Sequence, residues 1–160
     1  MRSLPSALTV EMMSLTAPLP TVARTVLREE LVAFGESLGG SLTPPHLLAL
    51  SGDLGAGKTT LIQAICRGYG VTTAVTSPTF TLVHVYDAPR SQVFHLDLYR
   101  LRDPSELTNI GWDDILNEPA IVVVEWADRA GARLPHGHTR IHLDHVDQDA
   151  QLRALRVEIR

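Results

Sequence analysis

The sequence predicts an α/β fold: a three-layer sandwich in which helices cover a mixed sheet with parallel core strands and antiparallel hairpins. A short apolar run at 47–50 enters a glycine-rich loop, and a helical pattern at 61–66 follows that loop directly. The continuous β-branched run at 121–124 is typical of a strand buried on both faces. Further pairs of β-rich segments, each separated by turn residues, indicate hairpins.

Length, composition and charge limit the class of protein. A chain of 160 residues with 44% hydrophobic content is long enough for one domain with a core. The formal net charge is −4, and affinity for a phosphate backbone comes mainly from clustered lysine and arginine. We therefore expect no binding to DNA and no independent binding to RNA, which a partner would have to hold.

Cysteine usage and hydropathy indicate the compartment. Cys66 is the single cysteine, which excludes a disulfide within the chain and fits a reducing compartment. We interpret it as a small buried thiol without a redox role. No apolar run approaches membrane-spanning length, and residues 1–20 lack a continuous signal-type core. The predicted location is the cytoplasm, with no membrane contact.

The first part of the chain leads up to the glycine-rich loop. Residues 1–13 are expected to form a flexible extension, and residues 14–160 a single domain. The segment 14–17 reads as a short edge strand, stopped by prolines. Apolar residues at helical spacing from 22 to 38 then predict a helix that stops at Gly39-Gly40.

The elements after the loop have clear turn and cap signals. Segments 80–86 and 92–98 are rich in β-formers and are joined by about five turn residues, which predicts an antiparallel hairpin. Asp103-Pro104-Ser105-Glu106 predicts a helix start, with Asp as N-cap, Pro in the first position and Glu three residues after the cap. Segments 139–143 and 154–159 indicate a closing pair of strands.

The stretch Gly52–Thr60 fits the phosphate-binding pattern G-x-x-x-x-G-K-[ST], and its strand and helix flanks complete a P-loop unit. Its glycines let backbone N–H groups turn inward around phosphate oxygens, and the helix N-terminus adds partial positive charge. We expect Lys58 to reach the β- and γ-phosphates and the Thr59 hydroxyl to bind Mg²⁺. The loop residues predicted to bind nucleotide are Asp53, Leu54, Gly55, Ala56, Gly57, Lys58, Thr59 and Thr60. The fold prediction thereby becomes a P-loop NTPase sandwich, with ATP and Mg²⁺ as cofactors.

Two carboxylates are predicted to return to the edge of the sheet where this loop lies. If the strand entering the loop points toward the nucleotide, the second hairpin strand runs in the same direction and brings Asp97 to that edge. Asp97 and His95 then lie on the same face of that strand. The strand at 121–124 delivers Glu125 to that edge too. Each carboxylate is either a hydrated strand end or a group that binds Mg²⁺ through water or positions the attacking water.

Other polar and aromatic residues leave more than one reading open. Thr79 is either a sensor of the γ-phosphate or an ordinary turn threonine. Trp126 stacks on the nucleotide or a partner, or it belongs to the core. Four histidines straddle a loop and a strand, and we interpret them as solvated side chains and not as a metal site: His136, His138, His142 and His145.

Four segments together resemble the TsaE family, and the resemblance covers roughly residues 14–160. They match the family in order and spacing: Gly52–Thr60, Ser77-Pro78-Thr79-Phe80, His95-Leu96-Asp97-Leu98-Tyr99-Arg100 and Val124-Glu125-Trp126. The phosphate loop alone would indicate only a superfamily, whereas the other segments are specific. The resemblance implies an ATPase subunit of tRNA threonylcarbamoyladenosine biosynthesis. It would work with the TsaB and TsaD proteins, which modify the adenosine beside the anticodon, and would meet tRNA only through them.

The resemblance also implies roles for individual residues, with Lys58, Asp97 and Glu125 as the catalytic set. By motif matching it places magnesium ligands at Thr59 and Glu125, a phosphate ligand at Lys58, a switch at Thr79, support for hydrolysis at Asp97, and nucleotide contacts at Trp126 and Arg153. Because the sequence offers no clear arginine finger, we expect weak turnover alone and stimulation by partners.

Two other functions compete with this reading. One is a P-loop phosphotransferase acting on a small molecule, with the segment 101–118 as its lid. The other is a nucleotide-gated binding module without turnover. A GTPase is disfavoured because the sequence has no N-K-x-D guanine signature.

Overall fold

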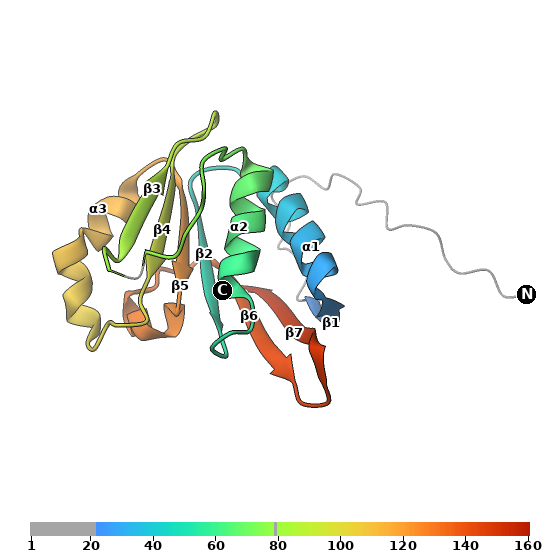
Figure 1. The fold of residues 1–160 in the computed structure, drawn as a ribbon. Coiled ribbons are helices and arrows are strands. Elements are labelled where there is room, and N and C mark those ends of the chain that lie inside the picture. Colours follow the sequence, from blue (N-terminus) through green and yellow to red (C-terminus); the bar gives the residue numbers. More distant parts are fainter. Residues whose placement is uncertain (1–21, 79) are drawn as a thin grey trace, which may run out of the picture.

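A computed structural model describes residues 22–78 and 80–160, which form a mixed sheet between two helical layers (Figure 1). The segment 14–17 and Thr79 lie outside the described residues. Seven strands are present in the described part: β1 (Val22–Leu27), β2 (His46–Gly52), β3 (Val83–Tyr86), β4 (Val93–Asp97), β5 (Ile121–Glu125), β6 (Thr139–Val146) and β7 (Asp149–Ile159). The helices there are α1 (Arg28–Ser41), α2 (Lys58–Tyr69), η1 (Pro104–Ile110), α3 (Trp112–Asn117) and η2 (Ala127–Arg133).

The strand order is β1-β7-β6-β2-β5-β4-β3. The core strands β6, β2, β5 and β4 are parallel. The outer pairings, β3 with β4, β6 with β7 and β1 with β7, are antiparallel. The predicted fold class and both predicted hairpins are therefore confirmed. Because β2, β5 and β4 run in the same direction, their carboxyl ends meet at one edge of the sheet.

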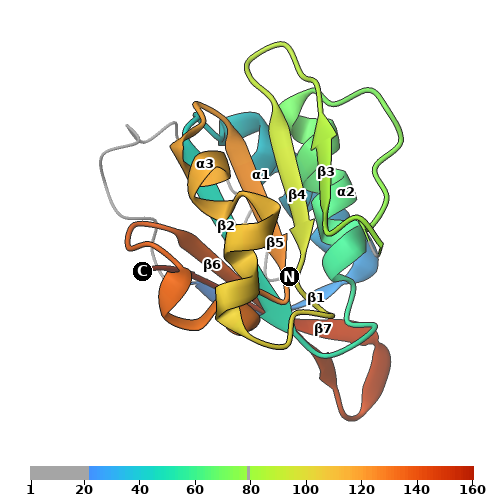
Figure 2. The same ribbon diagram turned by 90° about the vertical axis from the view of Figure 1, so that its left-hand side faces the viewer.

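Helices cover the core strands on both faces. The helices α1 and α2 lie on one face, and η1, α3 and η2 lie on the other, which faces the viewer in Figure 2. The strand β5 is buried throughout, and its side chains alternate between the two layers: Ile121 and Val123 pack toward α2, and Val122 and Val124 toward α3. Among the described residues, no helix is long and apolar enough to cross a membrane.

The predicted helix from 22 to 38 is wrong at its beginning. Residues Val22–Leu27 form the edge strand β1, which pairs with β7 from Val22 opposite Val157 to Leu27 opposite Leu152. Three of its six residues are β-branched, which suits a pleated edge strand better than a helix. The apolar spacing across this segment mixes a strand with the helix α1, so a single helical period does not describe it.

The helix α1 continues past Gly39-Gly40 to Ser41, so these glycines do not stop it. Gly39 lies where α1 crosses α2 most closely: a Cβ there would overlap the Ile65 carbonyl. Reciprocally, a Cβ at Gly68 on α2 would overlap the Glu36 carbonyl of α1. The glycines therefore allow the two helix backbones to touch.

We expect Gly39→Ala to lower the free energy of unfolding by about 1–3 kcal/mol, because the added methyl group would force the two helices apart. Gly40→Ala is the matched control, since its Cβ would lie 3.8 Å from the Gly68 carbonyl oxygen, an ordinary contact. There the better helix propensity of alanine should leave stability unchanged or raise it by up to about 1 kcal/mol. Urea unfolding of both variants measures the difference. Equal effects at the two positions would contradict the close helix crossing.

Two local predictions are confirmed. Asp103 caps η1: its Oδ1 accepts from the Ser105 N–H at 2.8 Å, and Glu106 Oε1 accepts from the Asp103 N–H at 2.9 Å. Cys66 is fully buried between α2 and the sheet. Burial raises the pKa of its thiol to about 12, so the side chain is uncharged at neutral pH and acts as a packing residue.

Candidate nucleotide-binding site

The loop between β2 and α2 is shaped by glycines in left-handed conformations. Gly55 and Gly57 have φ values of 75° and 106°, which residues with a Cβ rarely adopt. Gly57 is the N-cap of α2 and has no side chain that could cap the helix. The first N–H groups of α2 are therefore open to an anion, which the helix N-terminus favours electrostatically.

Two cavities flank this loop and share Gly55, Gly57 and Thr60. The first has a volume of 280 Å³ and is also lined by Leu54, Lys58, Thr59, Glu125 and Trp126. The second has a volume of 170 Å³ and is also lined by Arg28, Leu31, Ala56 and Arg153. All predicted nucleotide-binding residues in the described part line these cavities except Asp53, which contributes its backbone to the loop.

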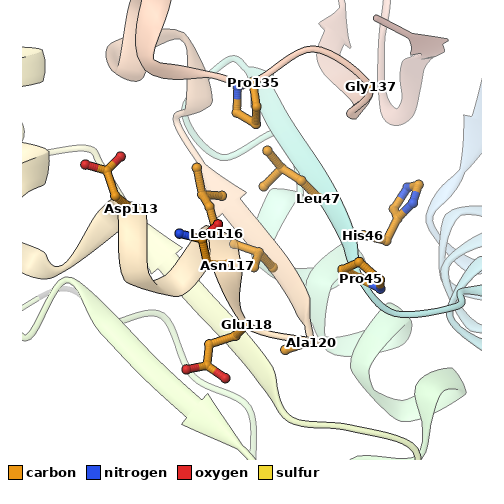
Figure 3. A pocket seen from close by; sticks show the side chains of 11 residues that line it. Pro45, His46, Leu47, Asp113, Leu116, Asn117, Glu118, Ala120, Pro135 and Gly137 are labelled. Carbon is orange, nitrogen blue, oxygen red and sulfur yellow. The ribbon is translucent and has the colours of Figure 1, made fainter.

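A third cavity, of 380 Å³, lies at the opposite end of the sheet (Figure 3). It lies by the first residues of β2 and β5, His46 and Ile121, with the apolar Leu47 and Val122 in its wall and the carboxylates of Asp113 and Glu118 at α3. None of its lining residues comes from the glycine-rich loop. The chemistry of the lining, and not cavity volume, therefore identifies the site at the loop.

Lys58 is held by its own loop. Its Nζ donates to the carbonyl oxygens of Gly52 at 3.0 Å and Asp53 at 2.6 Å, and it lies 4.1 Å from the centre of the Trp126 ring. Burial lowers the pKa of Lys58, and the nearby carboxylates, Glu125 foremost, oppose that shift. The ammonium is thus partly desolvated beside the cavity, in a place where a phosphate oxygen would stabilise its charge.

The structure brings Glu125 and Asp97 to the carboxyl-end edge beside Lys58. They lie opposite each other on the neighbouring strands β5 and β4. The Thr59 hydroxyl, in the first turn of α2, donates to Glu125 Oε1 and Oε2 at 3.2 and 3.3 Å. A threonine hydroxyl and a carboxylate are oxygen ligands of the kind that Mg²⁺ prefers, so these residues fit a magnesium ion. The assigned roles stay predictions.

Asp97 is buried, and both of its carboxylate oxygens have partners. Oδ1 accepts from the Tyr99 N–H at 2.9 Å, and Oδ2 accepts from the Ser77 hydroxyl at 2.7 Å. Ser77 belongs to the loop that leads to Thr79, so Asp97 fixes this loop to the same edge. Sequence reasoning used Ser77 only as part of a motif and gave it no contact, because the loop's path cannot be read from its residues.

Trp126 has a strained backbone, with φ 56° and ψ 41°, which is uncommon for a bulky residue. The centre of its ring lies 5.0 Å from the centre of the Tyr99 ring and 4.1 Å from Lys58 Nζ. A strained residue at the wall of a cavity is consistent with a functional constraint. The structure therefore places Trp126 at the site and not in the middle of the core.

The paired strands β6 and β7 contact the glycine-rich loop through His145 and Arg153. Arg153 Nε donates to the Ala56 carbonyl at 2.9 Å. The Asp53 carboxylate accepts from the His145 N–H at 3.3 Å, and the His145 ring lies 3.0 Å from the Leu54 carbonyl oxygen. His145 is exposed, as the sequence suggested, and it also contacts this loop.

The interpretation as a solvated side chain is wrong for His138, which is buried just before β6 with its Nδ1 2.7 Å from the Pro135 carbonyl oxygen. His142 is half-buried and has partners at both nitrogens, the Ser51 hydroxyl at 2.7 Å and Asp144 at 2.8 Å. The pairing of β6 with β2 brings Ser51 to His142, which residue spacing alone does not reveal, whereas Asp144 lies two residues further along β6.

The fold and this loop together define the class: an α/β protein with the three-layer P-loop NTPase fold. The family model described as "Threonylcarbamoyl adenosine biosynthesis protein TsaE" matches residues 26–154. That match covers most of the sequence. The chain therefore belongs to the TsaE family, which takes part in tRNA threonylcarbamoyladenosine biosynthesis, as the four sequence segments indicated.

Individual relatives support the family assignment. The chain is 38% identical over 128 residues to the tRNA threonylcarbamoyladenosine biosynthesis protein TsaE of Nostoc sp. strain PCC 7120, with 78% of each chain covered. It is 37% identical over 122 residues to the protein of the same name from Haemophilus influenzae, covering 73% of this chain and 77% of the relative. The crystal structure of Bacillus subtilis YdiB superposes with a TM-score of 0.73 at 26% identity, covering 88% of this chain and 87% of YdiB.

Proposed function

We propose that this chain is the Mg²⁺-dependent ATPase subunit that supports threonylcarbamoyl transfer to the adenosine beside the tRNA anticodon, in the cytoplasm. It would work with the TsaB and TsaD proteins and meet tRNA through them. One observation carries the proposal: the Thr59 hydroxyl and the Glu125 carboxylate meet in the first turn of α2, beside the open helix N-terminus and Lys58.

The residues at this edge divide the work of phosphoryl transfer. The N–H groups at the start of α2 and the Lys58 ammonium would bind the β- and γ-phosphates. Thr59 and Glu125 would hold Mg²⁺, which neutralises charge on the phosphoryl oxygens when bound. Asp97, buried on the next strand, would orient the attacking water through a carboxylate oxygen now bonded to Ser77. Each group acts by position and charge and forms no covalent bond.

The arginines argue for dependence on a partner. In the described residues, the arginines that line the loop cavities are Arg28 and Arg153, and both lie in the cavity that excludes Glu125. Arg153 is already bonded to Ala56. An arginine that neutralises the transition state can raise turnover by about 10³-fold or more. A chain that lacks one at the γ-phosphate should be slow until a partner completes the site.

Phosphate release from ATP labelled at the γ-position tests the proposal. We expect slow, EDTA-sensitive release by the chain alone and at least about 10-fold faster release with TsaB, TsaD and tRNA. Fast turnover by the chain alone would contradict partner dependence. Assembly with TsaB and TsaD that requires ATP but releases no phosphate would instead indicate a nucleotide-gated binding module. Label transferred to a small molecule, seen by thin-layer chromatography, would indicate a phosphotransferase.

A further inference from the structure

His95 is a buried histidine in contact with the carboxylate to which we assign the metal. Its Nε2 lies 2.9 Å from Glu125 Oε1, and the two side chains are 0% and 4% exposed. Its Nδ1 is buried and has no hydrogen-bond partner among the described residues. The ring packs against Tyr86, with ring centres 6.3 Å apart. Sequence reasoning placed His95 on the face of Asp97 but gave it no role.

The hydrogen-bond pattern indicates which nitrogen carries the proton. An ionised carboxylate only accepts hydrogen bonds, so the Nε2 of His95 must donate to Glu125. A proton on Nδ1 would be a buried donor without a partner, whereas a bare Nδ1 leaves only an unpaired acceptor. This hydrogen-bond pattern assigns the tautomer with the proton on Nε2, and that N–H points at Glu125.

We propose that His95 is a positioning residue for Glu125, an inference that rests on the proposed function. Glu125 is held from two sides, by His95 at 2.9 Å and by Thr59 at 3.2 and 3.3 Å. A bound metal would itself engage the Thr59 hydroxyl, so Thr59 is not an independent support. His95 comes from β4, an element separate from the loop and from α2, so its hydrogen bond would orient Glu125 with or without a metal.

Such a support should act on magnesium and not on the nucleotide itself. Groups that hydrogen-bond to a metal ligand change metal affinity by about 10- to 100-fold when they are removed. Among the described residues, His95 makes no hydrogen bond or ion pair with the glycine-rich loop or with Lys58, so nucleotide binding without metal should not depend on it. The signature is therefore a loss of the Mg²⁺-dependent part of nucleotide affinity alone.

The pair His95→Gln and His95→Asn tests this inference. The amide nitrogen of glutamine can occupy the position of Nε2 and donate to Glu125. The amide nitrogen of the shorter asparagine occupies the position of Nδ1 and cannot reach Glu125. The control is His138→Asn, since His138 is also buried with one unpartnered nitrogen but bonds Pro135 at the far end of the sheet. Binding of a fluorescent ATP analogue is measured in Mg²⁺ and in EDTA, and ring ¹⁵N NMR of the nucleotide-free protein identifies the protonated nitrogen.

In His95→Asn, we expect the ratio of nucleotide affinity in Mg²⁺ to that in EDTA to fall by about 10-fold, with binding in EDTA unchanged. His95→Gln should retain most of that ratio, and His138→Asn all of it. Equal behaviour of the two His95 variants, or an NMR signal showing Nε2 without a proton, would overturn the inference. Failure of the unmodified chain to bind nucleotide in either condition would refute the proposed function, while the NMR result would still decide the contact between His95 and Glu125.

Discussion

Lys58→Ala is expected to lower the affinity for ATP by about 10- to 100-fold and to abolish hydrolysis, the largest effect that we predict for a single side chain. Hydrogen bonds to charged groups contribute about 1.5–3 kcal/mol each, which corresponds to that range in affinity. In the present structure the ammonium is bonded to the Gly52 and Asp53 carbonyls. Binding would move it from these neutral acceptors to phosphate oxygens, so truncation removes a charge contact that no neighbour replaces.

Isothermal titration with ATP and Mg²⁺ measures this loss. The control is Arg67→Ala, a second cation on α2, whose ion pair with Glu36 is exposed on the side of the helix that faces α1. It should bind ATP as the unmodified chain does, because exposed ion pairs contribute little to stability. Unchanged affinity in Lys58→Ala would contradict the placement of the triphosphate at this loop.

Lys58 is also the only lysine in the sequence, which gives a direct view of its movement. After reductive methylation with ¹³C, its dimethylamino group provides one lysine NMR signal besides that of the amino terminus. We expect this signal to shift when ATP is added, because Nζ leaves the face of the Trp126 ring, 4.1 Å away, and its ring-current field. A signal that stays fixed while ATP binds would show that the lysine keeps its present contacts.

The parts of the fold that sequence predicts are those with a local physical cause. The glycines of the loop, the β-branched run of β5 and the proline-marked start of η1 each specify their own conformation. Strand direction then places Asp97 and Glu125 at one edge, because parallel strands share a carboxyl end. That step needs only topology, which is why the convergence of two distant carboxylates could be anticipated.

The parts that sequence missed depend on partners far along the chain. Val22–Leu27 is a strand because β7 supplies its hydrogen bonds, and no nearby residue reveals that. Gly39 resembles a helix stop until the backbone of α2 is placed against it. His95 differs from other strand histidines only because Glu125 on the next strand comes within hydrogen-bond distance. Such contacts follow from register and packing, which a residue pattern does not contain.

Glu125→Gln and Asp97→Asn are expected to separate metal binding from turnover. Glu125→Gln removes the negative charge that would face Mg²⁺ and keeps the size of the side chain. The affinity for ATP in Mg²⁺ should fall by about 100-fold, while affinity in EDTA should be retained or raised, because repulsion between the carboxylate and the phosphates is gone. His95 can still donate to the amide oxygen, so the fold should be preserved.

Asp97→Asn should instead lower kcat by about 100-fold with nearly unchanged affinity, because Asp97 acts on the attacking water. The structure explains why this variant should fold. Its amide oxygen can accept from the Tyr99 N–H, as Oδ1 does now, while the Ser77 hydroxyl rotates to accept from the new amide N–H. The contacts at the edge therefore survive, and only the charge is lost.

Steady-state turnover and nucleotide titration, both with TsaB and TsaD present, distinguish the two carboxylates. Asp113→Asn is the control, an exposed aspartate paired with Arg133 on the other helical layer, and it should change neither quantity. If Asp97→Asn lost affinity and turnover equally, Asp97 would be a binding residue. If the affinity of Glu125→Gln for ATP still depended on Mg²⁺, the hydrogen bond between Thr59 and Glu125 would serve only to stabilise the first turn of α2. The metal would then need ligands elsewhere along the edge that β2, β4 and β5 share.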